Sequence, residues 1–449
     1  MPSPNPHIAI VGTGVAGLMA GRRLRELLPN SRIAFYDAAS QSGGRLKSIV
    51  IKDDVEGAEE IVELGGARFH PEHHPMVHAL LEQLEIPTRD YQCALSPVHR
   101  AYFGYVLDVL RDILQRLQAS FKEATPAEQS YLSFGDAAAR FLGSDARDLI
   151  ATAVGYDTLL HPNMSFASGM ELLRQHPETS TLWGGHQGWL TPAKGFQSLT
   201  HALEAELRQT CTFHYGRSLR TFTSSAVCCQ LGFDCPTGHS TEIADYVILA
   251  VAMRDLEHVS GARVPKVVSD AVIDVPLAKG YFTFDAPWWT DLGLKGQCFT
   301  TATAFRKIYF PAQGRSVQIY SDGPSARLLQ ELVAKSTREE IAREFSAALQ
   351  DAVSIPMSTQ RVLEAQSGWA FWERGVSFWK PGLRLMPPDC LAISDRHYFC
   401  SDLCTTSNGW VEGALVSADA TARKIAEHAR QRALQLDDQP SAETAGVRA

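Results

Sequence analysis

The sequence lacks several features that would point to membrane, secretory or nucleic-acid-binding classes. None of its apolar runs reaches the roughly 18 residues that a membrane-spanning helix needs. The polar, proline-rich residues 1–7 contain no basic segment followed by an apolar one, so no secretory signal is expected. Basic residues are not in excess, since the formal net charge is −8, which argues against a general nucleic-acid binder. We therefore expect a cytoplasmic protein that binds neither membranes nor nucleic acid.

Sequence patterns typical of metal-binding sites are also rare. The nine cysteines include no CxxC pair, so reduced thiols are expected rather than a zinc site. His70, His73 and His74 lie close together in the sequence. A metal site there is the alternative, but a polar loop after a buried strand is the preferred interpretation, and no bound metal is expected.

The first positive signal is a glycine-rich turn between a strand and a helix. Residues 7–12 are apolar on both faces, as in a buried parallel strand, and apolar positions over residues 15–28 recur with helical spacing. In such a turn, the glycines let the backbone approach a pyrophosphate, and the helix N-terminus attracts phosphate. An acid after the next strand can accept the ribose hydroxyls. The dinucleotide-binding residues predicted here are Gly12, Gly14, Ala16, Gly17 and Asp37.

Three further segments decide which dinucleotide is bound. They are Ser42-Gly43-Gly44-Arg45-Leu46, Glu63-Leu64-Gly65-Gly66-Ala67-Arg68, and Cys400-Ser401-Asp402 followed by Gly409-Trp410-Val411-Glu412-Gly413-Ala414. In this order they resemble the flavin amine oxidase family and not the NAD dehydrogenases. Within that family, Gly155-Tyr156-Asp157, His176-Pro177-Glu178, Pro287-Trp288-Trp289 and the segment 306–310 are similar to bacterial L-amino-acid oxidases, among them the L-tryptophan oxidase of violacein biosynthesis.

The resemblance implies a bound FAD. The residues that it assigns to the cofactor, besides the glycine turn and Asp37, are Gly44, Arg45, Gly66, Ala67, Arg68, Asp402, Trp410, Val411 and Glu412. In many amine oxidases the segment matching residues 375–377 carries an aromatic residue, and sometimes a cysteine bound to the flavin. Here it is Gly-Val-Ser, so the FAD is expected to be non-covalent.

The resemblance also implies a substrate site. Arg68 matches an arginine that binds the substrate carboxylate, and Lys279 matches a lysine that holds a water against flavin N5. Tyr156, His176, Tyr320, Trp372 and Trp410 match residues near the substrate or the flavin face. For each of these residues a purely structural role is the alternative.

The expected fold is α/β. A Rossmann-like FAD-binding domain of the glutathione-reductase type is interleaved with a substrate domain made of a mixed sheet and helices. The FAD-binding domain is predicted over 1–65, 190–260 and 388–432, and the substrate domain over 66–189 and 261–387 with its helical part at about 76–180. Residues 433–449 are predicted to be a disordered tail.

The expected activity is that of an FAD-dependent L-amino-acid oxidase. Arg68 would aim the substrate Cα–H at flavin N5, and hydride transfer would give an imino acid that hydrolyses to a 2-oxo acid and ammonia. Reoxidation by O2 would give hydrogen peroxide. Tryptophan or another large aromatic or apolar amino acid is favoured, with a homodimer and an imine-consuming enzyme as candidate partners. The alternatives are an oxidase of amines without a carboxylate, a porphyrinogen-type oxidase, and a flavin-binding scaffold without catalysis.

Overall fold

The computed structural model describes residues 5–52, 59–95, 103–180, 188–262, 270–353, 357–382, 391–405 and 407–437, and the chain forms two compact units. The first unit comprises Met1–Gly44, Thr200–Ser269 and Pro387–Ala449, and the second comprises Arg45–Leu199 and Asp270–Met386. Residues 45–65 and 190–199 thus fall in the second unit, whereas the sequence placed them in the FAD-binding domain. They belong there because strands β3 (Ser48–Lys52) and β4 (Glu59–Glu63) pair with each other and pack on that unit's apolar side chains.

The first unit is built on a sheet in the order β18-β19-β12-β1-β2-β8. Its strands are β18 (Leu391–Ser394), β19 (His397–Phe399), β12 (Tyr246–Leu249), β1 (His7–Val11), β2 (Arg32–Tyr36) and β8 (Thr212–His214). All neighbours run parallel except β18 and β19. The inner strands are buried along nearly their whole length, as the continuous apolar runs predicted. The chain returns to this sheet at β12, which pairs with β1.

Helices α1 (Val15–Leu27) and α14 (Val411–Asp437) pack together in this unit. Arg23 Nε lies 2.7 Å from Asp419 Oδ1, and Arg430 donates to the carbonyl oxygen of Leu27 at 2.9 Å. A small antiparallel sheet is added by β9 (Ser218–Ser224), β10 (Cys229–Cys235) and β11 (Gly238–Ala244). Residues 433–437, predicted as the start of a disordered tail, continue α14 to Asp437, while residues 438–449 of the predicted tail lie outside the described residues.

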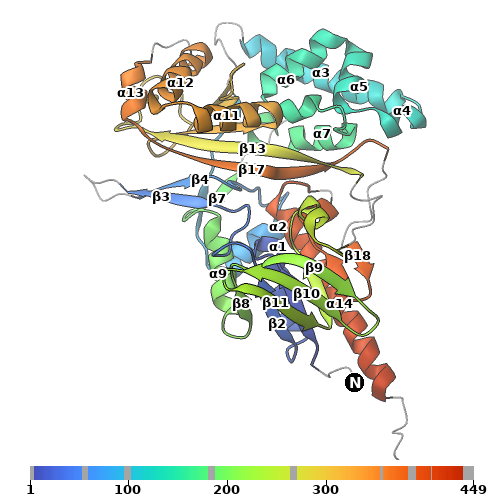
Figure 1. Cartoon of the computed structure of the whole chain (residues 1–449). Coiled ribbons are helices and arrows are strands. Elements are labelled where there is room, and N and C mark those ends of the chain that lie inside the picture. Colours follow the sequence, from blue (N-terminus) through green and yellow to red (C-terminus); the bar gives the residue numbers. More distant parts are fainter. Residues whose placement is uncertain are drawn as a thin grey trace, which may run out of the picture. The chain divides into compact units, whose positions relative to one another are not determined.

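The second unit contains a sheet in the order β17-β13-β16-β15-β14-β6. Its strands are β17 (Gln366–Trp379), β13 (Val272–Thr283), β16 (Ser316–Asp322), β15 (Lys307–Phe310), β14 (Gln297–Thr300) and β6 (Ala94–Leu95). Along β15 and β16 apolar and polar residues alternate, so the two kinds of side chain leave on opposite faces. The apolar face packs against α11 (Gly323–Lys335), α12 (Arg338–Val353) and α13 (Thr359–Glu364), which lie along one side of the β13–β17 pair in Figure 1.

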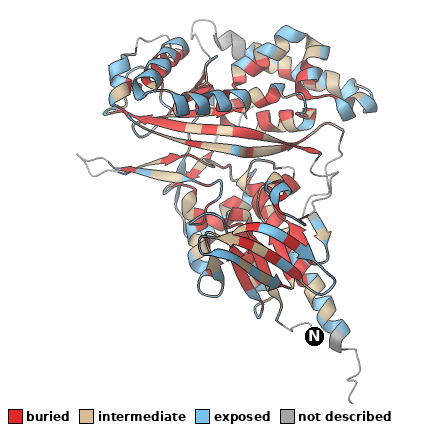
Figure 2. Cartoon of the chain, in the orientation of Figure 1, coloured by how far each residue is buried: buried red, intermediate tan, exposed pale blue. Residues whose placement is uncertain are grey.

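A second group of helices in this unit surrounds its own apolar core. These helices are α3 (Phe103–Glu123), α4 (Pro126–Tyr131), α5 (Phe134–Leu142), α6 (Ser144–Val154), η1 (Asp157–Leu160), α7 (Phe166–Gln175) and α8 (Pro177–Ser180), preceded by α2 (Pro75–Gln83). The stripe of Leu110, Leu114 and Leu117 predicted from the helical spacing is fully buried. Figure 2 shows the result, with buried residues along the strands and exposed ones on the outer faces of the helices.

The remaining elements of the chain are short. Strand β5 (Thr88–Asp90) pairs with β7 (Leu190–Pro192), and α9 (Gln197–Leu207) and η3 (Met253–His258) belong to connecting segments, as does η4 (Asp402–Cys404). Within the described part of the chain, the longest helices are too polar to cross a lipid bilayer.

Candidate functional site

The glycine turn of the first unit has the geometry of a phosphate site. Gly14 caps α1 without a side-chain hydrogen bond, and the first turn of the helix carries no acidic residue. The backbone N–H groups there meet no carboxylate of that turn that would compete with a phosphate. A Cβ on Gly17 would lie 2.0 Å from the carbonyl oxygen of Gly12, so a side chain cannot be accommodated at this close approach. Ala16 follows in the first turn of the helix.

The Gly43-Gly44 segment contacts the glycine turn at Gly14. Gly43 donates its N–H to Thr13 O at 3.2 Å and forms a bridge with Gly14. A Cβ on Gly44 would lie 3.1 Å from Gly14 Cα, so bare backbone of two segments meets at this point. Asp37 lies beside the turn and accepts from the N–H and hydroxyl of Thr13 at 2.7 and 2.6 Å. These residues fit the adenosine and pyrophosphate half of a dinucleotide.

The C-terminal motif folds around a buried carboxylate. Asp402 accepts from Ser401 Oγ at 3.0 Å and from the N–H of Gly409 at 2.8 Å, which closes the loop that leads to α14. Trp410 precedes this helix, and Val411 and Glu412 form its first turn. The structure therefore places Asp402, Trp410, Val411 and Glu412 at one helix N-terminus, the end that favours negative charge on a ligand.

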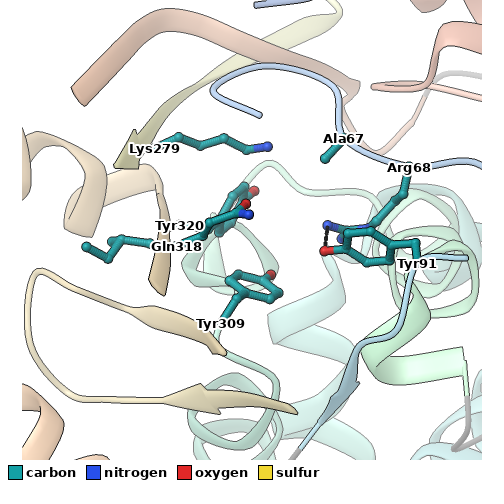
Figure 3. A pocket seen from close by; sticks show the side chains of 8 residues that line it. Ala67, Arg68, Tyr91, Lys279, Tyr309, Gln318 and Tyr320 are labelled. Atoms are coloured by element: carbon teal, nitrogen blue, oxygen red, sulfur yellow. Dashed lines mark hydrogen bonds between the residues drawn. The ribbon is translucent and has the colours of Figure 1, made fainter. Parts of the chain in front are cut away.

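The second unit holds a pocket on the polar face of its large sheet. Eight residues line it, namely Ala67, Arg68, Tyr91, Lys279, Tyr309, Gln318, Ile319 and Tyr320. Lys279 on β13, Tyr320 on β16 and Lys307 on β15 are cross-strand neighbours, so they share one face. In Figure 3 the amine of Lys279 and the hydroxyl of Tyr309 approach the same space, with Arg68 and Tyr91 along one side.

Arg68 is held by two side chains that the sequence also singled out. Its Nη2 lies 2.9 Å from His176 Nδ1, and the hydroxyl of Tyr156 lies 2.6 Å from the same nitrogen. A guanidinium can only donate, so His176 Nδ1 must be the acceptor. The imidazole is then neutral with its proton on Nε2, and Arg68 Nη2 and the Tyr156 hydroxyl both donate to the single lone pair of Nδ1, which they share. Arg68 Nη1 lies 3.5 Å from the hydroxyl of Tyr91.

The segment before Arg68 is bound by its backbone carbonyl groups. Lys279 donates through Nζ to the carbonyl oxygen of Gly65, and Trp372 donates through Nε1 to that of Leu64 at 3.0 Å. Trp372 therefore supports the strand end that leads to Gly66 and Ala67 and does not itself line the pocket. Arg45, predicted to bind the pyrophosphate, donates to the carbonyl oxygen of Gly375 at 3.0 Å.

Sequence reasoning missed four of the lining side chains, namely Tyr91, Tyr309, Gln318 and Ile319. Tyr309 and Gln318 are opposed across β15 and β16, one alternation away from Tyr320. The alternation of polar and apolar residues along β15 and β16 was a usable signal. It puts Tyr309, Gln318 and Tyr320 on the face of the sheet that carries Lys279.

The second unit also contains two buried carboxyl groups, those of Glu63 and Asp322. Burial raises the pKa of Glu63 to about 7, although hydrogen bonds from Ser48 and the Phe196 N–H oppose the effect. Burial, and then the nearby Asp157, raise the pKa of Asp322 to about 6. Asp322 accepts from the N–H groups of Asp157 and Thr158 at 2.9 and 3.2 Å.

The histidine cluster is a local hydrogen-bonded turn. The N–H of His70 donates to His74 Nδ1 at 2.8 Å, and burial lowers the pKa of His74 to about 3. Among the residues that the structure describes, no group of His, Cys, Asp and Glu side chains is arranged to hold a metal ion, and the cysteines there are free thiols.

Comparison with known proteins agrees with this arrangement. The sequence model described as flavin containing amine oxidoreductase matches residues 15–426. Among solved structures, wild-type putrescine oxidase bound to putrescine is similar with a TM-score of 0.69 and 17% identity, over 94% of this chain and 99% of that one. A double mutant of putrescine oxidase made to redesign cofactor binding gives a TM-score of 0.67 and 17% identity, over 94% and 99%. The fold is thus that of a Rossmann-like flavin-binding domain with a substrate domain.

Proposed function

The chain belongs to the family of flavin-containing amine oxidoreductases, and from that premise we propose that it is an FAD-dependent oxidase of L-α-amino acids. The family implies a flavin. The proposal adds that the flavin is FAD, that it is bound without a covalent bond, and that the substrate carries a carboxylate.

The charge of the pocket is the main support for a substrate with a carboxylate. Arg68 and Lys279 are basic side chains, and none of the eight lining residues is an aspartate or a glutamate. A substrate carboxylate would find a guanidinium able to donate two parallel hydrogen bonds. A diamine such as putrescine carries two positive charges, and these lining residues offer it no opposing carboxylate. The pocket charge therefore favours an amino acid over a simple amine.

The second candidate is an amine oxidase, and the likeness to putrescine oxidase is the observation that favours it. At 17% identity this likeness concerns the fold, which serves many substrates. A porphyrinogen-type oxidase is the third candidate on the same fold.

The walls of the pocket support a large side chain on the substrate. Tyr91, Tyr309 and Tyr320 present aromatic rings and hydroxyl groups, and Gln318 presents an amide. An aromatic side chain would gain contact area from the rings. An indole N–H would find hydroxyl and amide oxygen acceptors. Tryptophan and related aromatic amino acids are therefore the preferred substrates within the class.

In the proposed mechanism the protein mainly positions the substrate. Arg68, held by His176 and Tyr91, would fix the carboxylate and so restrict the orientation of the Cα–H bond. The substrate amine reacts in its neutral form, because the nitrogen lone pair must become the π bond of the imine. Lys279 would hold a water molecule next to the reacting centre. A bound flavin would supply the two-electron acceptor, and O2 would finally take the two electrons as hydrogen peroxide. Water then hydrolyses the imino acid to a 2-oxo acid and ammonia.

A substrate screen tests the proposal. The purified flavoprotein is assayed for peroxide release with the twenty L-amino acids, D-tryptophan, tryptamine and putrescine. We expect turnover with one or more L-amino acids, led by aromatic ones, and little with the two amines. Turnover confined to tryptamine or putrescine would establish the amine oxidase instead. A flavin that no L-amino acid bleaches without O2 would refute the proposal.

A further inference from the structure

A buried lysine lies behind the aromatic wall of the pocket. Lys307 on β15 is fully buried, and its Nζ lies 3.1 Å from the centroid of the Tyr156 ring and 5.8 Å from that of Tyr320. It is not one of the lining residues. Removing an ammonium group from water costs free energy, and an apolar residue could fill the same volume. The ammonium faces these two aromatic rings, and its contact with Tyr156 is close enough to influence that side chain.

The chain makes room for this side chain at Gly155. Gly155 ends α6 with a left-handed backbone (φ 66°), and a Cβ there would lie 2.7 Å from Thr300 Cγ2 and 3.1 Å from Lys307 Cγ and Cε. The stem of Lys307 thus packs on bare backbone immediately before Tyr156. The next residues are held in a similar way, because Arg306 donates through Nε to Asp157 at 2.8 Å. Lys307, the first residue of β15, and Arg306 just before it thus contact Tyr156 and Asp157, the N-cap and the first residue of η1.

A continuous set of contacts leads from Lys307 to Arg68. The ammonium lies on the face of the Tyr156 ring, the Tyr156 hydroxyl donates to His176 Nδ1, and the same nitrogen accepts from Arg68. A cation over an aromatic face draws electron density from the ring, which makes the phenolic O–H a stronger donor. Because Nδ1 has a single acceptor lone pair, a stronger bond from Tyr156 competes with the bond from Arg68. It fixes the His176 ring beside Arg68 and leaves more of the Arg68 N–H groups for a ligand carboxylate.

We propose that Lys307 is a positioning residue for the carboxylate site, acting on Arg68 through Tyr156 and His176. The inference rests on the proposed function, in which Arg68 binds the substrate carboxylate. Lys307 itself does not touch the substrate. Its removal should therefore weaken carboxylate binding more than it slows the chemical step.

Binding of two probes measures this effect in the holoenzyme. Indole-3-acetate has a carboxylate but no amine, and tryptamine has the amine but no carboxylate. Perturbation of the flavin absorbance reports the Kd of each. For Lys307→Met, which retains the length of the side chain without its charge, we expect the Kd of indole-3-acetate to rise about tenfold. The Kd of tryptamine should change less than about twofold, and with the best amino acid KM should rise more than kcat falls.

A double-mutant cycle tests the route of the effect. Tyr156→Phe retains the ring under the ammonium and removes only the hydroxyl, so it should weaken indole-3-acetate binding by a similar factor. Combining it with Lys307→Met should add less than about twofold, because both changes remove the same hydrogen bond. Lys335→Met, at an exposed site on α11, is the matched control and should leave both Kd values unchanged.

The outcomes separate this inference from the proposed function. If Arg68→Ala loses indole-3-acetate binding but Lys307→Met does not, the role of Lys307 is wrong while the carboxylate site stands. If neither Arg68→Ala nor Lys307→Met changes the Kd of indole-3-acetate, Arg68 does not bind a carboxylate and the proposed function itself is refuted. Fully additive effects of Lys307→Met and Tyr156→Phe would exclude the route through Tyr156. Should Lys307→Met not retain flavin, an unchanged Kd in Tyr156→Phe would overturn the inference by itself.

Discussion

Glu63 should make the stability of the protein fall as pH rises toward 8. Its carboxyl group is 8% exposed and accepts from Ser48 Oγ and from the N–H of Phe196, each at 2.6 Å. Burial raises its pKa in the folded protein from 4.5 to about 7. Between these two values the folded state binds more protons than the unfolded chain, so the free energy of unfolding decreases with increasing pH. Ionising Glu63 in the folded protein therefore costs about 3 kcal/mol, since one pKa unit corresponds to about 1.4 kcal/mol.

Glu63→Gln removes this ionisation and retains the shape of the side chain. Its amide oxygen can still accept from the N–H of Phe196, and its NH2 group can donate to Ser48 Oγ. Denaturant unfolding of both proteins at pH 5, 6, 7 and 8 gives the difference in free energy at each pH. We expect the variant to gain about 3 kcal/mol relative to the wild type between pH 5 and pH 8. Glu331→Gln, at an exposed ion pair with Lys335, is the control and should show no such trend. A constant difference between Glu63→Gln and the wild type over this range would refute the reasoning.

Three further changes test other parts of the structure. Gly17→Val should yield protein without flavin, because a Cβ there would lie 2.0 Å from Gly12 O, and the absorbance ratio of flavin to protein checks this. Arg306→Met should destabilise the fold by about 3–5 kcal/mol in denaturant unfolding, because it removes the cation paired with the partly buried carboxylate of Asp157 and the donor to the carbonyl oxygens of Thr301 and Ala151; a loss below about 1 kcal/mol would contradict this. Lys279→Met should slow the reoxidation of reduced enzyme by O2, and an unchanged rate in stopped-flow measurements would remove the role proposed for this lysine.

Much of the first unit could be predicted from the sequence because its signals are local. The glycine turn, the strand before it and the helix after it lie within one short stretch, and each has its own pattern. The domain limit predicted at residue 65 differs from the boundary of the compact unit at Gly44, because the apolar contacts of β3 and β4 to Tyr281 and Ala370 join residues far apart in the chain.

The pocket could be predicted only in part for the same reason. Arg68, Lys279 and Tyr320 were named from the resemblance, and the structure brings them together. The register that aligns β13, β16 and β15 is set by long-range pairing, and no local pattern reports it. The buried contact between Arg306 and Asp157 joins residues 149 positions apart and was equally invisible in the sequence.

The central claim is that Arg68 selects a substrate carboxylate. Its most direct test is kcat/KM of the wild type and of Arg68→Ala for the best L-amino acid and for the amine that lacks only the carboxylate. We expect Arg68→Ala to lose about 100-fold with the amino acid, or about 2.7 kcal/mol, and less than about threefold with the amine, while flavin stays bound. An unchanged preference for the amino acid over the amine in Arg68→Ala would contradict the account.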